Sequence, residues 1–269
     1  MRPGLDDKVL ADWNGMMIAA LARAGQLLEE PAWIEAAAAA FAEVVDRLGN
    51  GDRLAHSYRD GRRLDLGFLD DHVQMARSAA ALFAATGNAP YRDHATTWIA
   101  TAFRDYRDDT GAFRPGPADG RLPVASRWQT DGPTPSPIGT LATVCAQLWH
   151  LTADTDHARD AQSIIDRYAG EIARNPAGYA SLMLASAWLR EATLLVLTGD
   201  GAAVSPLGQT VRRHLPGFAI RVDGDPYVPI SHPAHGKTAV GGQPTLYVCR
   251  DGTCRPPVVD AANVAEALS

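Results

Sequence analysis

The chain has 269 residues, 46% of them hydrophobic and 21% charged, with a formal net charge of −6 at pH 7, which fits one large or two modest globular domains. The mild acidic excess and the lack of a Lys/Arg-rich stripe argue against nucleic acid and anionic membranes as partners. Because no apolar run has the length of a membrane span and the first residues lack a signal-peptide pattern, we expect a cytoplasmic protein.

Apolar residues recur at helical spacing through the first two thirds of the chain. The predicted helices form pairs, with a lone helix at the end: 7–28 with 31–48, 68–87 with 89–108, 136–154 with 156–174, and then 179–192. A helical hairpin therefore recurs roughly every 60 residues, which is the regularity of a repeat architecture.

The connections within each pair are short, whereas those between pairs, 49–67 and 108–137, are long and rich in Gly, Pro and Arg. Loops of this length in a compact helical protein are more often functional than incidental. If the pairs stack side by side, the long loops and the starts of the first helices meet on one face. Those starts carry Trp13-Asn14, Asp70-Asp71-His72 and Pro135-Ser136-Pro137.

The last part of the chain changes character. The apolar, branched runs 191–199 and 217–224 flank a helical stretch at 205–215, which predicts a strand–helix–strand unit. A strand and turn at 244–259 and a closing helix at 260–269 follow. We therefore predict a mainly α protein, with a helical-hairpin domain over 1–190 and a small α/β appendage over 191–269.

The cysteines and histidines of the loops give no clear metal or cofactor site. Cys145 has the helical context of a small buried side chain. The spacing of Cys249 and Cys254 permits a disulfide, but in the cytoplasm we expect a hairpin with two reduced thiols. Two thiols are half of a zinc site, and the SHPAHGK stretch (231–237) is typical of a surface loop. With neither a phosphate-binding loop nor a nucleophile elbow in the sequence, we predict no metal and no cofactor.

Asp70, Asp71 and His72 stand at the start of an otherwise apolar predicted helix. In one interpretation the acids only cap the helix, one by accepting backbone N–H groups and the other by its charge at the positive end of the dipole. In the other, one acid caps and the other lines a site. On that interpretation Asp70 is the helix-start residue and Asp71 faces the site.

Other candidates also have two interpretations each. His56 and Tyr58 alternate along a strand-like stretch, so they share a side, either in a polar surface hairpin or as an acid–base histidine with an aromatic platform. Trp128 and Asp131 belong either to an ordinary loop or to a site. Trp13 has the helical spacing of a core residue, although it also stands at a helix start.

Several stretches resemble the C-terminal portion of the YyaL / spermatogenesis-associated protein 20 family: DDKVLADWNGMMIAALARAG, LAHSYRDGRRLDLGFLDDHV, TDGPTPSPIGTLA and LYVCRDGTCRPPV. Members of this family have a thioredoxin-like domain followed by an α/α-toroid of the six-hairpin glycosidase and N-acylglucosamine 2-epimerase type. The thioredoxin-like domain and the early hairpins have no counterpart here, so the resemblance implies a partial α/α-toroid.

The resemblance also implies a carbohydrate site at the mouth of the toroid. We expect catalytic roles for His56, Asp71 and Asp131 and substrate binding by Trp13, Asn14, Tyr58, Asp70 and Trp128. An epimerase or isomerase would use His56 as its base, whereas a glycosidase would pair Asp71 with Asp131. The alternative is a non-catalytic scaffold that needs a partner chain, or a missing N-terminal portion, to complete its ring.

Overall fold

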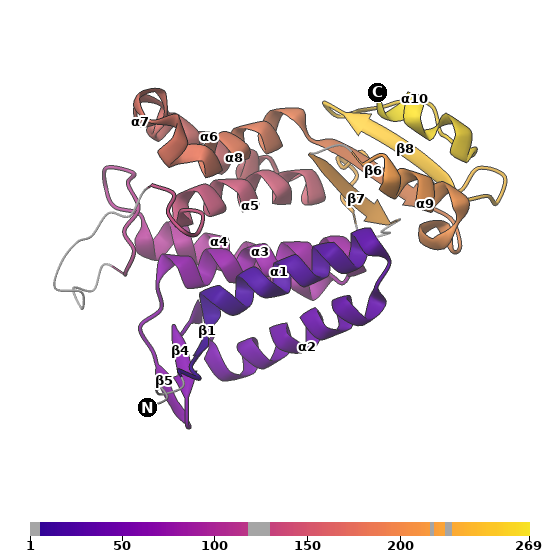
Figure 1. The fold of residues 1–269 in the computed structure, drawn as a ribbon. Coiled ribbons are helices and arrows are strands. Elements are labelled where there is room, and N and C mark those ends of the chain that lie inside the picture. Colours follow the sequence, from indigo (N-terminus) through magenta and orange to yellow (C-terminus); the bar gives the residue numbers. More distant parts are fainter. Residues whose placement is uncertain (1–5, 118–129, 216–217, 224–227) are drawn as a thin grey trace.

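The computed structural model describes residues 6–117, 130–215, 218–223 and 228–269 (Figure 1). Trp128, predicted to bind substrate, lies outside these ranges. The helical pairs are confirmed, with the bounds α1 Ala11–Leu28, α2 Pro31–Leu48, α3 Leu69–Thr86, α4 Ala89–Tyr106, α5 Pro137–Thr152, α6 Thr155–Arg167, α7 Ala169–Arg174 and α8 Ala180–Glu191. Prolines in the first turns of α2, α4 and α5 begin these helices, and Gly87, with φ of 68°, ends α3 in the left-handed conformation.

The helices α1, α3, α5 and α8 lie side by side and run in the same direction, and we call them the inner helices (Figure 1). The helices α2, α4 and α6 run in the opposite direction and connect one inner helix to the next along the chain. The contact of α1 with α3 is close because Gly15 has no side chain: a Cβ there would lie 2.7 Å from the Gln74 carbonyl carbon. The starts of the inner helices therefore meet at one end of the molecule, as the repeat predicts.

The row of inner helices curves. If the four inner helices packed in a flat row with about 8–10 Å between neighbouring axes, the axes of α1 and α8 would be more than 20 Å apart. Nevertheless, the guanidinium carbon of Arg23 in α1 lies 5.8 Å from the ring centre of Trp188 in α8. The first and last inner helices thus approach each other, as they do in part of a ring.

The long connection between the first two pairs folds into short strands: β2 Gly49–Asn50, β3 Arg53–Leu54, β4 Ser57–Arg59 and β5 Arg62–Leu64. Strand β4 also pairs with β1, Val9–Leu10, directly before α1. The Ala11 N–H donates to the His56 carbonyl at 3.0 Å, so this hairpin holds His56 at the start of α1.

The strand–helix–strand prediction is confirmed. The sheet has the order β7-β6-β8-β9, from β6 Thr193–Thr198, β7 Ala219–Asp223, β8 Thr245–Arg250 and β9 Thr253–Cys254. Strand β6 is buried on both faces: Leu194 and Val196 join the core of the helical part, whereas Leu195 and Leu197 join a second core with α9 Pro206–Arg213 and α10 Val264–Leu268. The change from helix to sheet comes after α8, and the division of the chain into two domains at residue 190 stays a prediction.

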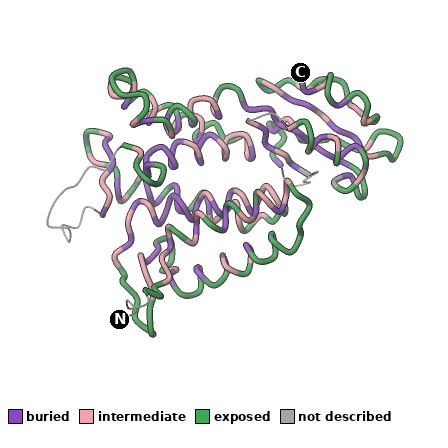
Figure 2. The backbone as a smooth tube through the Cα atoms, in the orientation of Figure 1, coloured by how far each residue is buried: buried purple, intermediate pink, exposed green. Residues whose placement is uncertain are grey.

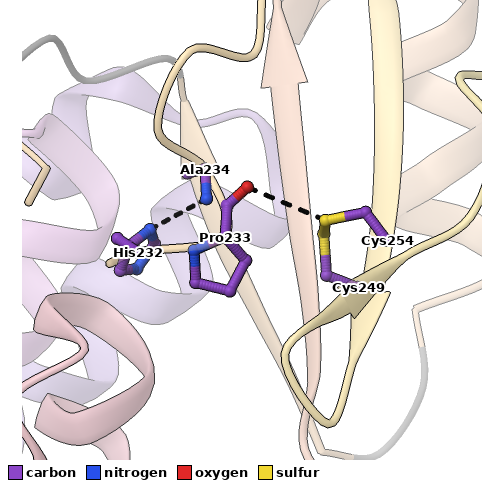
Figure 3. The surroundings of a disulfide bond; sticks show 5 residues. All are labelled: His232, Pro233, Ala234, Cys249 and Cys254. Atoms are coloured by element: carbon purple, nitrogen blue, oxygen red, sulfur yellow. Dashed lines mark hydrogen bonds between the residues drawn. A yellow bond between two sulfur atoms is a disulfide. The ribbon is translucent and has the colours of Figure 1, made fainter. Parts of the chain in front are cut away.

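Two predictions about single side chains are wrong, and one of the two interpretations of a third side chain is excluded. Cys249 and Cys254 face each other across β8 and β9, with Cα atoms 3.9 Å apart, and form a disulfide instead of two thiols (Figure 3). His232 in the supposed surface loop is 2% exposed, because its ring bonds the Ala234 N–H and the His150 carbonyl. Trp13 is 63% exposed and is no core residue.

The central inner helices are the most buried. Helices α3 and α5 are buried along most of their length, whereas α2 is exposed along its outer side (Figure 2). Within the described residues, no helix combines the length and the apolar character that a membrane span needs.

Candidate functional site

A histidine and a carboxylate form the centre of the candidate site. His56 comes from the residue before β4, and Asp71 from the first turn of α3. The Nδ1 atom of His56 lies 3.1 Å from each carboxylate oxygen of Asp71. Asp71 is fully buried, while a quarter of the His56 side chain remains exposed. The hairpin and the helix start therefore build a buried acid that orients a partly accessible imidazole.

Asp71 is also the residue that caps α3. Its Oδ2 accepts the N–H of Phe68, the residue before the helix, at 2.8 Å, and its Oδ1 accepts the N–H of Asp12 from α1 at 3.2 Å. This corrects the assignment of Asp70 as the helix-start residue. Asp71 both caps the helix and bonds His56, and Asp70 lies beside the pair.

Asp12, His56, Asp70 and Asp71 lie together, and we call these four titratable groups the cluster. Within it, Asp70 and Asp71 compete for protons. Burial, followed by the charges of Asp12 and Asp71, raises the pKa of half-buried Asp70 to about 7. Burial raises the pKa of Asp71 to about 6 against the opposing hydrogen bond from His56. The pKa of His56 is raised, mainly by the hydrogen bond to Asp71. Near neutral pH the cluster can therefore take up and release protons, which is typical of acid–base sites.

The contacts of His56 leave one ring nitrogen for chemistry. Nδ1–H donates to Asp71, and the Phe68 ring meets the imidazole edge-on with ring centres 4.9 Å apart. In this arrangement Nε2 is the atom that can exchange a proton with a ligand.

Asp12, His56 and Asp71 could also hold a metal ion, since their ligand atoms lie within 4.8 Å of one another. However, the hydrogen bonds already account for the arrangement: Nδ1 of His56 and both oxygens of Asp71 bond each other and two backbone N–H groups. The absence of a metal stays a prediction.

His72 has a structural role. Its Nε2 accepts the Leu54 N–H at 3.1 Å, and its Nδ1–H donates to the Phe68 carbonyl at 2.9 Å. The ring is buried, and burial lowers its pKa. A neutral His72 thus clamps the hairpin to the start of α3.

Other predicted residues lie around the cluster without bonding to His56. Trp13 is next in sequence to Asp12 and donates its backbone N–H to that carboxylate at 2.8 Å. The Asn14 side chain donates to the Leu10 carbonyl. The guanidinium carbon of Arg47 lies over the Tyr58 ring, 5.0 Å from the centre of that ring. Their roles in binding a ligand stay predictions.

Asp131 has contacts of its own. Oδ1 accepts the Ser136 N–H at 2.8 Å and the Ser181 hydroxyl at 2.6 Å, and Oδ2 accepts the Ser181 N–H at 2.8 Å. Burial would raise its pKa, but these hydrogen bonds prevail and lower it. Asp131 fastens the starts of α5 and α8, and among the described residues no hydrogen bond joins it to the His56–Asp71 pair.

The sequence analysis missed Asp12. It stands in the first turn of α1, as Asp70 and Asp71 do in the first turn of α3. The signal was therefore an acid at the same place in two successive hairpins.

A hollow of about 590 Å³ adjoins the hairpin. It includes His72 but none of the four titratable groups of the cluster, and its lining is mostly polar: Asn50, Arg53, Leu54, Arg63, Asp65, Leu66, Gly67, His72, Arg104, Asp105, Tyr106 and Pro117. The arginines in it already pair with aspartates, as Arg53 does with Asp105 at 2.8 Å.

No protein-family model matches the chain. Human spermatogenesis-associated protein 20 is 24% identical over 292 residues, which cover 99% of this chain and 37% of that protein. The chain is therefore a homologue of this protein, in agreement with the resemblance seen in the sequence. It spans less than two fifths of the length of the curated relatives it matches.

Two solved structures share the fold. The GH76 α-mannanase BT2949 of Bacteroides thetaiotaomicron is 14% identical with a TM-score of 0.56, over 69% of this chain and 56% of that one. The cellobiose 2-epimerase of Spirochaeta thermophila is 18% identical with a TM-score of 0.53, over 62% and 44%. The helical part is thus a partial α/α-toroid of the six-hairpin glycosidase-like kind.

Proposed function

We propose that this chain binds a saccharide at the start of the inner helices and acts on it by proton transfer through His56. The observation that carries the proposal is the buried Asp71 that holds His56 in one orientation, beside an Asp70 whose pKa is raised to about 7. The fold neighbours support the substrate class, because their names are those of a mannanase and an epimerase.

The geometry favours an isomerase or epimerase over a glycosidase. A glycosidase needs two carboxyl groups that face one bond. Here Asp71 is occupied by His56 and two backbone N–H groups, and Asp131 is occupied by Ser136 and Ser181. An imidazole next to a protonated carboxyl instead suits proton abstraction beside a sugar carbonyl.

The proposed reaction balances with these groups alone. His56 Nε2 takes the proton from C2 of an open-chain aldose, while protonated Asp70 gives its proton to the carbonyl oxygen. The enediol then regains a proton at C1 from His56, and Asp70 takes back the proton of the C2 hydroxyl. The product is the ketose. Return of the proton to the other face of C2, with the C1 hydroxyl giving its proton to Asp70, would instead give the epimer.

Proton exchange tests this proposal directly. We would incubate the chain with cellobiose, mannose or glucose in D₂O and follow loss of the C2 proton by NMR. His56→Asn should reduce exchange by about 100-fold or more, the usual contribution of a general base. His214→Asn, at an exposed position directly after α9, should leave the rate unchanged. If no sugar binds or exchanges, the proposal is wrong.

A second candidate is a scaffold that completes its ring with another chain or with a further part of a longer protein. It rests on exposed apolar residues of the two edge inner helices: Trp13 and Met17 in α1, and Met183 and Leu184 in α8. Light scattering after size-exclusion chromatography tests it. A stable monomer at micromolar concentration would count against this candidate.

A further inference from the structure

Helix α3 is buried except along one narrow stripe. Among its residues, Asp70, Arg77, Ala81 and Ala84 are partly accessible, whereas nearly all others in its first four turns are buried. Steps of seven, four and three residues keep these positions on one side of a helix. We call this side the open stripe of α3. It begins at the proton-transfer cluster and leads away from it.

Gln74 lies at the edge of the open stripe, one turn after Asp70, and is 1% exposed. Its amide nitrogen reaches the Thr140 hydroxyl at only 3.4 Å, and its amide oxygen has no hydrogen-bond partner among the described residues. A buried acceptor without a donor is unfavourable, because it has lost its hydrogen bonds to water. A hydroxyl group that docks on the stripe would supply this donor.

The stripe then reaches Arg77, which belongs to an unusual pair. Arg23 from α1 acts on Arg77 as a like charge, and Arg23 itself lies over the Trp188 ring. Among the described residues, no carboxylate forms an ion pair with either guanidinium. Most other arginines of the helical part do have such a partner, as Arg53 and Arg104 do. Two neighbouring cations without an anion indicate a place for an anionic group.

We propose that the ligand is an anionic saccharide of about two rings, with hydroxyl groups on Asp70 and Gln74 and its acidic group on Arg77 and Arg23. This inference rests on the proposed function, since it places the reacting sugar ring at the cluster. Asp70 and Arg77 are seven residues apart, about 10 Å along the helix, a distance that a disaccharide spans. Arginine binds both carboxylate and phosphate by paired N–H groups, so the anion is a uronic acid or a sugar phosphate.

Calorimetric titration of the 269-residue chain separates the possibilities. The probes are cellobiose, cellobiouronic acid and cellobiose 6′-phosphate, at low and at 0.3 M salt. We expect at least one anionic probe to bind about 10-fold or more tightly than cellobiose, as charge-assisted hydrogen bonds imply. Salt should weaken only the anionic probe, and which one binds better identifies the acid group.

Variants locate the effect. Arg77→Gln should bring the anionic probe to within about threefold of cellobiose and leave cellobiose binding unchanged. Arg23→Gln, at an exposed position that tolerates substitution, should act in the same direction and serves if Arg77→Gln does not fold. Arg62→Gln, on the exposed hairpin, is the matched control and should keep the full preference.

Each outcome has one meaning. Equal binding of cellobiose and the anionic probes overturns this inference and leaves the proposed function standing. A preference that survives both arginine variants also overturns it. Failure of every probe to bind overturns both proposals. Loss of the preference in Arg77→Gln and Arg23→Gln, but not in Arg62→Gln, establishes the site.

Discussion

Replacing Asp70 by Asn should stabilise the protein at alkaline pH and have little effect in acid. The folded pKa of about 7 lies above the ordinary value of 3.8, because burial and the charges of Asp12 and Asp71 disfavour the carboxylate. Folding therefore favours the protonated form of Asp70. Its contribution is neutral below about pH 4, becomes increasingly destabilising as the pH rises from about 4 to about 7, and stays constant above that. An uncharged amide in place of the carboxylate would remove that cost.

The size of the effect follows from the same values. The difference between 3.8 and about 7 corresponds to about 4 kcal/mol. Asp70 is partly exposed, so water screens its charge, and we expect about half of this. The substitution also gives up a favourable interaction with the helix dipole worth about 0.5 kcal/mol. The net gain for Asp70→Asn is then about 1–2 kcal/mol at pH 8.5 and about zero at pH 4.5.

Urea unfolding followed by circular dichroism at several pH values measures this difference. Asp46→Asn, on the exposed side of α2, is the control and should stay within about 0.5 kcal/mol at every pH. A loss of stability for Asp70→Asn at pH 8.5, or a gain that does not change with pH, would refute the reasoning. Asp70 would then be an ordinary ionised helix-start residue.

Three further substitutions test the packing. Gly15→Ala places a Cβ 2.7 Å from the Gln74 backbone and should lower the free energy of unfolding by about 2–3 kcal/mol; Gly132→Ala, which meets nothing within 4 Å, should be neutral. Asp131→Ala removes the acceptor of the N–H groups of Ser136 and Ser181 and should cost about 2–4 kcal/mol, with Asp131→Asn milder, in the same urea assay. Replacing both Cys249 and Cys254 by Ser should cost about 2 kcal/mol, and a reductant should lower the melting temperature of the wild type only.

The helical repeat could be predicted because it depends on local rules. The apolar spacing of α1 to α6, the prolines in first turns and the glycine at 87 each act within one or two turns. The two-sided burial of β6 also shows in sequence, as an unbroken apolar run from Leu194 to Leu197 between two threonines.

The errors share a physical cause, since each depends on which segments meet in space. The disulfide requires that β9 place Cys254 opposite Cys249, and buried His232 donates a hydrogen bond from Nε2 to the His150 carbonyl, which is distant in the sequence. Trp13 is exposed because it lies on an edge inner helix with no further described neighbour on that side. The cap is Asp71 and not Asp70 because the helix starts at Leu69, which puts Asp71 at the third helical position, where a side chain reaches back to the preceding N–H. Boundaries of this accuracy lie beyond sequence patterns.

The contrast between Asp131 and Asp70 is the strongest argument that the cluster exists for chemistry. Both stand at helix starts beside other polar groups. Asp131 shows what a structural carboxylate does in this fold: its two oxygens accept three hydrogen bonds, and its pKa falls. Asp70 has two acidic neighbours, partial burial and a raised pKa, although Asp71 alone already caps the helix. Among the described residues, Asp70 thus adds cost and no capping hydrogen bond at the start of α3, which is typical of a carboxylate retained for a ligand or a proton transfer.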